Sequence, residues 1–416
     1  MKIIRVQKKY ADNFYSLCKN KKTMKTFTKI IPVLAGIIAF VSCNDLCDCC
    51  DDAGIVGSSL SEVALMMSSL PIEQGQMEEV YSAVSSSSDN GYDEEYTMEK
   101  VFLSPGAGVG GTKAGTDYSR PLRELISEYY RSHPSSKAPG DAESRIAELT
   151  CSGCQIFWPY HENWDGESLP VITCDPGGES ASNLGYQLVE DPDGTRRVEE
   201  VTVDEEMAKN RPVWVINTND DSQYTSLEML RRQDPSWGQG DDIIVRPSTK
   251  AGTSSGEEEE LRTLILKDFT INRNYDSWFR GASEFFVKVG GVDGFTASTE
   301  EEMRNYQPSV TDFMIVVKRS DKGKPVPFNA ILVSDWTDQM EEMAFLITED
   351  DGGTQTRWKA SAVVKVNSKS YGIEMDIPFN EKDDIVWRGS LSSKFIKKYA
   401  GQIQHYGDVD LTFDFL

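Results

Sequence analysis

Oxygen-bearing side chains recur at fixed spacing in the stretch "NTNDDSQYTSLE", residues 217–228. Counted from the first residue, Asn217, Asn219 and Asp221 stand at positions 1, 3 and 5, and Glu228 stands at position 12. An EF-hand calcium loop spaces its ligands in this way, although it has a glycine where this stretch has a serine. The stretch is therefore a candidate calcium site. The alternative is a strand-to-helix loop with Thr225 as the helix cap.

A second acidic pattern lies nearer the C-terminus. The stretch "DSWFRGASEFFVKVG", residues 276–290, resembles the first loop and following strand of C2 domains, and residues 326–332, 347–353 and 381–389 resemble later parts of that family. The resemblance implies an antiparallel β-sandwich with acidic loops at one end, because calcium takes six to eight oxygens from several loops. The implied candidate calcium ligands are Asp276, Glu284, Glu349, Asp350 and Asp351, with Asp383 and Asp384 nearby. The alternative is a set of solvated turns on an acidic surface.

The N-terminus has the three parts of an export signal: lysines, the apolar run 30–41, and then Ser42 and Cys43. Such a run is too short to span about 30 Å of hydrocarbon as a helix. Residues 24–43 form a complete short signal, so Met24 is the expected start. The closing cysteine resembles the lipobox of bacterial lipoproteins, which predicts a diacylglycerol anchor on Cys43. An ordinary cleaved secretory signal is the alternative.

Charge and the residues after the signal indicate the location and exclude one class of partner. Residues 43–57 form an acidic tether that resembles the tethers of surface-exposed lipoproteins in Bacteroidota. This resemblance predicts a surface-exposed location on the outer membrane. The chain as a whole resembles uncharacterised lipoproteins of the same group. The net charge is −24 although residues 1–42 are basic, so the exported part is strongly acidic. Such a surface repels nucleic-acid phosphates, and we expect no nucleic-acid partner.

Three cysteines, Cys151, Cys154 and Cys174, lie in the middle of the chain. With His161 they could form a zinc set, but an oxidising compartment favours a disulfide between two of them. The sequence does not indicate which two are paired.

The remaining motifs are weaker indications of function. The glycines of "SPGAGVGGTK", residues 104–113, have the spacing of a dinucleotide-binding turn, but no buried strand precedes them and no helix follows directly, so we expect no nucleotide cofactor. Trp158, Tyr160 and Trp164, or Trp336 and Trp358, could stack on sugar rings, although tryptophans at strand ends are more often core. No nucleophile elbow is present.

Periodicity predicts an α+β, mainly β protein. We expect a helical region with Gly/Ser-rich loops over 58–150, including a loop over 85–97 and helices after Ser119 and over 142–149. A β-rich middle region over 151–247 follows, with a hairpin around "DPDG" at 191–194 and a helix over 225–232. A linker over 248–260 then leads to a C-terminal antiparallel sandwich over 261–416, with one helix near 393–399.

These features predict a lipid-anchored envelope protein that acts as a binding or structural module, with calcium as the candidate cofactor. Its ligand would be a glycan, a lipid or a protein. The alternative is a secreted hydrolase of glycans or peptides that uses a carboxylate pair.

Overall fold

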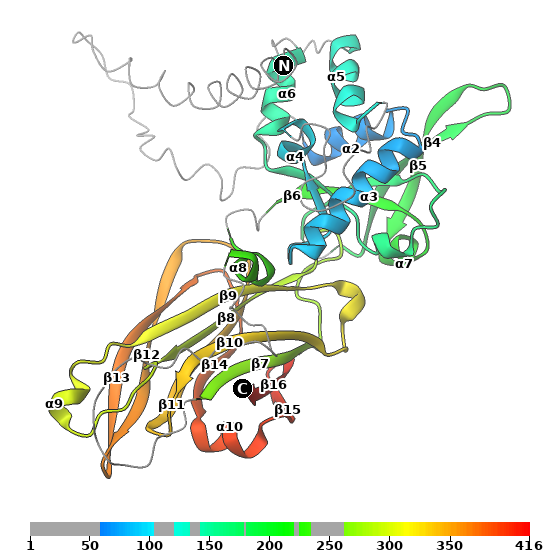
Figure 1. The fold of residues 1–416 in the computed structure, drawn as a ribbon. Coiled ribbons are helices and arrows are strands. Elements are labelled where there is room, and N and C mark those ends of the chain that lie inside the picture. Colours follow the sequence, from blue (N-terminus) through cyan, green and yellow to red (C-terminus); the bar gives the residue numbers. More distant parts are fainter. Residues whose placement is uncertain (1–58, 104–119, 134–141, 179, 220–223, 234–261) are drawn as a thin grey trace, which may run out of the picture. The chain divides into compact units, whose positions relative to one another are not determined.

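The computed structural model describes residues 59–103, 120–133, 142–178, 180–219, 224–233 and 262–416 (Figure 1). The described chain is mixed α+β with several antiparallel sheets, which confirms the predicted fold class. It divides into two compact units. The first contains described residues up to 86 and 95–219, and the second contains 87–94 and the described residues from 224 onward.

The first unit is built on a six-stranded sheet in the order β1-β2-β6-β3-β4-β5. Neighbouring strands are antiparallel except for β3 and β6, which are parallel. The predicted hairpin around residues 191–194 is β4 and β5. The strands are β1 (Glu95–Thr97), β2 (Cys154–Phe157), β3 (Val171–Cys174), β4 (Ser182–Glu190), β5 (Arg196–Asp204) and β6 (Val213–Thr218).

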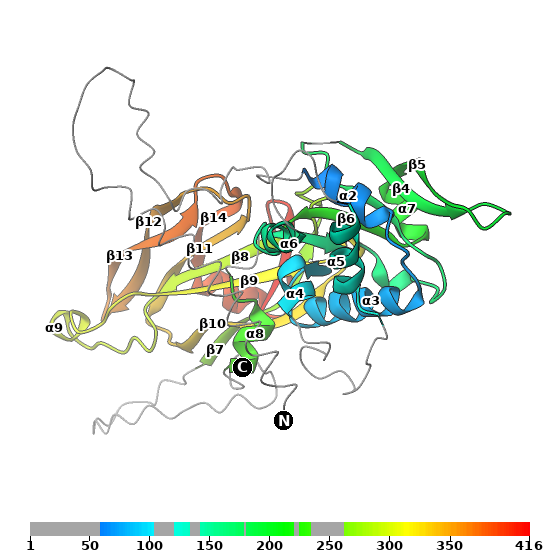
Figure 2. The same ribbon diagram turned by 90° about the horizontal axis from the view of Figure 1, so that it is seen from above.

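Helices pack on this sheet through one apolar face each, and Figure 2 shows α3 to α6 grouped together. In α5, for example, Leu122, Leu125 and Ile126 are buried on the same face. The core joins these side chains to alternate residues of the strands, such as Ile156 and Trp214. The helices are α2 (Leu60–Ser68), α3 (Gln74–Asp89), α4 (Met98–Leu103), α5 (Leu122–Ser132), α6 (Ala142–Thr150) and α7 (Glu205–Asn210).

The separate helical and middle regions expected from the sequence therefore share one core. An amphipathic helix must bury its apolar stripe against another element, and the sheet of the middle region provides that surface. The turn η2 (His161–Asn163) lies between β2 and β3.

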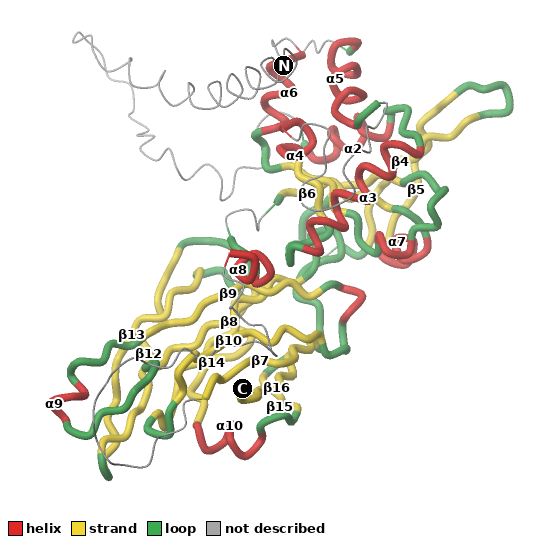
Figure 3. Tube along the Cα trace, viewed as in Figure 1, coloured by secondary structure: helices red, strands yellow, loops and turns green. Residues whose placement is uncertain are grey.

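The second unit contains the predicted C-terminal sandwich, and strands are its main secondary structure (Figure 3). One sheet has the order β10-β7-β16-β15, and the other has the order β13-β12-β11-β8-β9, with β14 also paired to β11. The strands are β7 (Arg262–Ile271), β8 (Ser283–Gly291), β9 (Ser309–Val317), β10 (Val326–Trp336), β11 (Met340–Glu349), β12 (Gln355–Val366), β13 (Lys369–Asn380), β14 (Asp384–Ser392), β15 (Ile403–Tyr406) and β16 (Val409–Phe415). The short helices are α8 (Leu227–Gln233), α9 (Glu300–Met303), η3 (Arg319–Asp321) and α10 (Ser393–Tyr399).

Strand β8 is buried on both faces, and this explains its continuous apolar and aromatic sequence. Phe285, Val287 and Val289 point into the core between the two sheets. On the opposite face the β12–β13 hairpin covers the strand. There Gly290 lies so close to Met375 that an added Cβ would come within 2.2 Å of the Met375 sulfur.

One segment differs from the expected loop over 85–97. Helix α3 continues to Asp89, and β1 begins at Glu95. The residues between them belong to the second unit, where the Tyr92 hydroxyl donates to the Tyr224 carbonyl at 3.1 Å. Local serine-rich composition predicted a loop, and these long-range contacts order it instead.

Several predictions fall on residues outside the described part of the chain: the signal and Cys43, the glycines of 104–113, and the linker over 248–260. Among the described helices, none combines the length and apolar character that a membrane crossing requires.

Candidate metal centre

Three of the predicted calcium ligands meet at one end of the C-terminal sandwich. Each of Asp276, Glu284 and Glu349 offers a carboxylate oxygen, and these oxygens all lie within 4.8 Å of one another. Asp276 lies in the loop between β7 and β8, Glu284 lies at the start of β8, and Glu349 ends β11. A group of three carboxylates from three chain segments is a suitable arrangement for a hard cation.

The antiparallel register brings two of these acids together. Strands β8 and β11 run in opposite directions, and Phe285 is the partner of Glu349. The start of β8 therefore lies beside the end of β11, and the amide of Asp350 donates to the carbonyl of Glu284 at 3.0 Å. The loop that carries Asp276 enters β8 at the same end.

Glu349 is the most buried member of the cluster, with 1 % of its surface exposed. Its Oε1 atom is buried and has no hydrogen-bond partner among the described residues. Burial, followed by the adjacent carboxyl of Asp276, raises the pKa of Glu349 far above its usual range. A buried carboxylate without a compensating charge is costly, so the group either holds a proton or needs a cation beside it.

Two arginines lie near the cluster. The Arg280 guanidinium lies 4.0 Å from the Asp276 carboxylate, and both side chains are partly exposed. Arg319 donates to the backbone carbonyl of Asp276 at 3.0 Å. These contacts leave Glu284 and Glu349 buried with 5 % and 1 % exposure, respectively.

Asp350 and Asp351, the other two predicted ligands, face different surroundings. The Asp350 carboxylate accepts from the side-chain amide of Asn380 at 3.3 Å and from the backbone N–H of Gly352 at 3.2 Å. Burial, together with the nearby Asp276 and Asp384, raises the pKa of the Asp351 carboxyl to about 6. Asp351 therefore belongs to the electrostatic surroundings of the three-acid cluster, while Asp350 is held by hydrogen bonds.

Asp383 and Asp384, expected nearby, do lie close to these acids. Burial raises the pKa of Asp383 to about 6, and Asp350 also contributes. Asp384 forms an ion pair with Arg273 at 3.5 Å.

Asp93 is a further acid that the sequence did not indicate. It is buried, and its carboxylate accepts from the amides of Ala282 at 3.3 Å and Glu94 at 2.9 Å. Gly281, with φ of +150°, leaves room for it: an added Cβ would lie 2.3 Å from Asp93 Oδ2 and 3.9 Å from Glu284 Oε1. Asp93 thus borders the cluster, although it lies 189 residues before Ala282 in the sequence. Local patterns carry no signal for such a contact.

The residues of the second calcium candidate have other described contacts. Asn217 is in strand β6, and the Asn219 amide donates to the side chains of Glu95 and Gln155, the latter at 2.9 Å. Glu228 lies in the first turn of α8 and pairs with Arg231 at 2.5 Å. Asp221 lies outside the described residues.

The structure holds all three predicted disulfide cysteines as thiols. Cys154 and Cys174 are free, buried thiols, and Cys151 is exposed. Cys154 pairs with Thr218 on one side of β6, and Cys174 pairs with Ile216 on its other side. Two strand spacings, roughly 9–10 Å, separate the two buried cysteines, which exceeds the reach of a disulfide. Among the described residues, none of these cysteines belongs to a group of side chains that could hold a metal ion.

Two of the tryptophans proposed to stack on sugars are core residues. Trp158 and Trp336 are almost completely buried, and Trp158 packs against Trp164 and Trp214. Trp358 is partly buried and packs with the outer-face core beside β12 and β13.

An antiparallel β-sandwich with a buried three-carboxylate cluster is the class of structure that the second unit defines. No protein-family model matches the chain, and it has no match among curated proteins or solved structures.

Proposed function

We propose that this protein is a lipid-anchored envelope protein whose C-terminal sandwich binds calcium through Asp276, Glu284 and Glu349, and that it acts as a binding or structural module. The observation that carries the proposal is Glu349, which is buried with an unpartnered oxygen beside two other carboxylates. A bound divalent cation would supply the charge that this group lacks.

The chemistry of the cluster favours calcium among the common cations. All three side chains offer hard oxygens, whereas zinc sites usually include histidine or cysteine. Magnesium requires nearly ideal octahedral geometry, while calcium accepts irregular sets of six to eight oxygens, including backbone carbonyls and water. Extracellular calcium sites function with dissociation constants as weak as about 1 mM, so an exported domain has no need of a tight site.

Thermal unfolding with and without calcium tests the proposal. A ligand that binds only the folded state at a hundredfold excess over its Kd stabilises that state by about 2.7 kcal/mol. For a domain of this size that corresponds to a rise in Tm of roughly 5–10 °C. We expect this rise when calcium is in hundredfold excess over its Kd, relative to chelator, with a smaller rise in magnesium.

The variants Glu349→Gln and Glu374→Gln make a matched pair for this experiment. Glu374 is an exposed residue of β13, so its variant should keep the calcium response. Glu349→Gln should lose the response and should be at least as stable as the wild type in chelator, because a neutral amide replaces an acid that must take up a proton when it is buried. An unchanged Tm in calcium, or a rise that persists in Glu349→Gln, would contradict the proposal.

The lipid anchor is tested separately. We expect wild-type protein in the membrane fraction with a mass increase on its N-terminal peptide, and Cys43→Ala in the soluble fraction. Two or more acyl chains give stable anchoring, whereas one gives only reversible binding. Membrane association that survives Cys43→Ala would count against this part of the proposal.

The hydrolase alternative requires a carboxylate pair that a polymeric substrate can reach. Glu349 and Glu284 are almost fully buried, and this favours a bound ion over a substrate in contact with them. Hydrolysis of a glycan or peptide by the wild type that is lost in Glu349→Gln, without any calcium response, would favour the hydrolase instead.

A further inference from the structure

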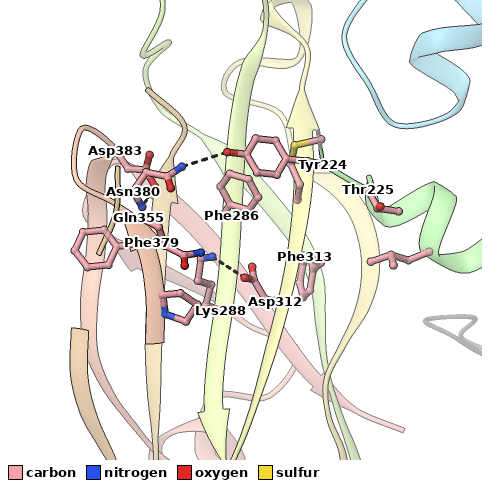
Figure 4. A pocket seen from close by; sticks show the side chains of 13 residues that line it. Tyr224, Thr225, Phe286, Lys288, Asp312, Phe313, Gln355, Phe379, Asn380 and Asp383 are labelled. Carbon is pink, nitrogen blue, oxygen red and sulfur yellow. Dashed lines mark hydrogen bonds and ion pairs between the residues drawn. The ribbon is translucent and has the colours of Figure 1, made fainter. Parts of the chain in front are cut away.

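A cavity of about 280 Å³ lies on the outer face of the C-terminal sandwich, and Figure 4 shows the residues that surround it. Its floor is the outer face of β8 and β9, where Phe286 pairs with Met314 and Lys288 pairs with Asp312. Because side chains alternate along a strand, these residues point away from the sandwich core.

Two further segments form its walls. One is the open end of the β12–β13 hairpin, where Gln355 and Asn380 are cross-strand partners. The other is the segment leading into α8, which carries Tyr224 and Thr225 and is held against β9 by a bridge between Ser226 and Met314. The Asn380 amide donates to the Tyr224 hydroxyl at 3.2 Å and so joins the two walls (Figure 4).

The lining of this cavity has one cationic side chain and two acidic ones. Lys288 is the one cationic side chain among its lining residues, and its ammonium pairs with Asp312 at 2.6 Å. The same ammonium lies 4.8 Å from the centre of the Phe286 ring. With its cation already paired and Asp383 also in the lining, the cavity does not favour an anion.

Polar groups in the cavity retain capacity for a ligand. The Gln355 amide and the Thr225 hydroxyl make no side-chain hydrogen bond with the described residues, and Lys288 has three N–H donors of which one serves Asp312. Asp383 is 7 % exposed, and its Oδ1 has no hydrogen-bond partner of good geometry in the described chain. Together they offer both donors and acceptors.

Aromatic rings stand beside these polar groups. Tyr224 and Phe379 are partly exposed, and Tyr224 packs edge-on against Phe286 with ring centres 4.7 Å apart. An apolar ring face next to mixed amide, hydroxyl and carboxylate groups matches a molecule that has both a C–H face and hydroxyls. The volume lies just below the usual range for ligand sites of roughly 300–1,000 Å³, so it suits a single sugar ring.

We propose that this cavity binds one neutral hexopyranose ring, with its C–H face on the aromatic side chains and its hydroxyls on Gln355, Asn380 and Lys288. This goes beyond the calcium proposal and does not require it. The cavity and the metal centre are neighbours, because Asn380 also donates to Asp350, the residue after Glu349.

Saturation-transfer difference NMR on the full chain tests this inference. The neutral probes are glucose, galactose, mannose and N-acetylglucosamine, and the charged probes are glucosamine and glucuronate. We expect millimolar binding of at least one neutral sugar, because a ligand with so few atoms binds weakly, and at least tenfold weaker binding of the anionic glucuronate. The measurement is made in chelator and repeated in calcium. Sugar binding in chelator would support this inference even if the calcium proposal fails.

Variants that fill the cavity with a large side chain, together with a matched control outside it, test the location of the site. Gln355→Trp fills it from the hairpin wall, Thr225→Trp fills it from the opposite wall, and Gln402→Trp places the same bulk at an exposed glutamine outside it. Both filling variants should weaken binding at least tenfold, while Gln402→Trp should leave it unchanged. No signal from any neutral sugar, preferential binding of a charged one, or full binding by both filled variants would overturn the inference.

Discussion

Gly281 lies against the carboxylate of Asp93, and this contact limits which side chains the position tolerates. Its φ of +150° is rarely adopted by other residues, and an added Cβ would lie 2.3 Å from Asp93 Oδ2. We expect Gly281→Ala to lower the free energy of unfolding by about 1–3 kcal/mol, the usual cost of such backbone strain.

Chemical denaturation measures this change, with Gly372→Ala as its control. Gly372 is also in the second unit. Its φ is not positive, and an added Cβ there would meet no atom within 4 Å. The control should stay within about 0.5 kcal/mol of the wild type. Equal stabilities for the two variants would show that Asp93 does not pack against Gly281 as described.

Asp383 gives a prediction for pH. Burial raises its pKa from the ordinary 3.8 to about 6, so the folded state holds a proton that the unfolded state releases. Its contribution to stability is therefore fully present below about pH 4 and is lost as the pH rises through about 6. The difference between the two pKa values corresponds to at most about 3 kcal/mol.

Denaturation of Asp383→Asn from pH 4 to pH 7, in chelator, checks this sign. The variant cannot titrate at this position, and its amide oxygen can still accept from the Asn380 backbone N–H, which donates to the Asp383 carboxylate at 3.0 Å. We expect the wild type to lose more stability than the variant over this range. Parallel pH profiles would contradict the raised pKa.

At the scale of elements, strand order decides the chemistry of the cysteines. Strand β6 lies between β2 and β3, so Cys154 and Cys174 stay apart, and burial raises the pKa of Cys154 to about 12. A protonated, buried thiol reacts slowly. We expect alkylation of the native protein to label the exposed Cys151 well before Cys154 or Cys174, with the last two labelled fully only in denaturant.

Peptide mapping by mass spectrometry reads each of these sites separately. Recovery of a linked peptide containing two of the three cysteines, in protein unfolded without reductant, would restore the disulfide that the export signal led us to expect.

Elements with a clear period were predictable from the sequence, and contacts between distant segments were not. Helix α10 and the β4–β5 hairpin have local signals, a short apolar repeat and the "DPDG" turn, and both form where expected. The serine-rich end of α3 has no such signal, and its structure depends on tertiary contacts. The same limit applies to the metal centre: the acids of β8 and β11 follow from antiparallel pairing, while Asp93 does not.

The cavity was missed for a related reason. Its residues come from β8, β9, the β12–β13 hairpin and the segment before α8, and each is an ordinary strand or turn residue in its own stretch. The aromatic residues singled out from the sequence were Tyr160 and four tryptophans, and large apolar side chains of this kind often fill cores.

At the scale of the whole molecule, the chain has two units with separate hydrophobic cores. The first unit's core combines helices α2 to α6 with one face of the six-stranded sheet. The second unit's core lies between the two sheets of the sandwich, with a further cluster on the outer face beside β12 and β13. Residues that share a core unfold together as one cooperative unit. Because the two units have separate cores, the chain is expected to depart from a single two-state transition. We predict two transitions in scanning calorimetry.

Calcium should distinguish the two transitions, because all three proposed ligands belong to the second unit. A ligand stabilises only the cooperative unit that binds it, so calcium should raise one midpoint and leave the other unchanged. Glu349→Gln should remove that shift and leave the calcium-insensitive transition at its wild-type midpoint. If both midpoints rise together in calcium, the two units unfold as one cooperative body, and the stability of the metal centre depends on the whole chain.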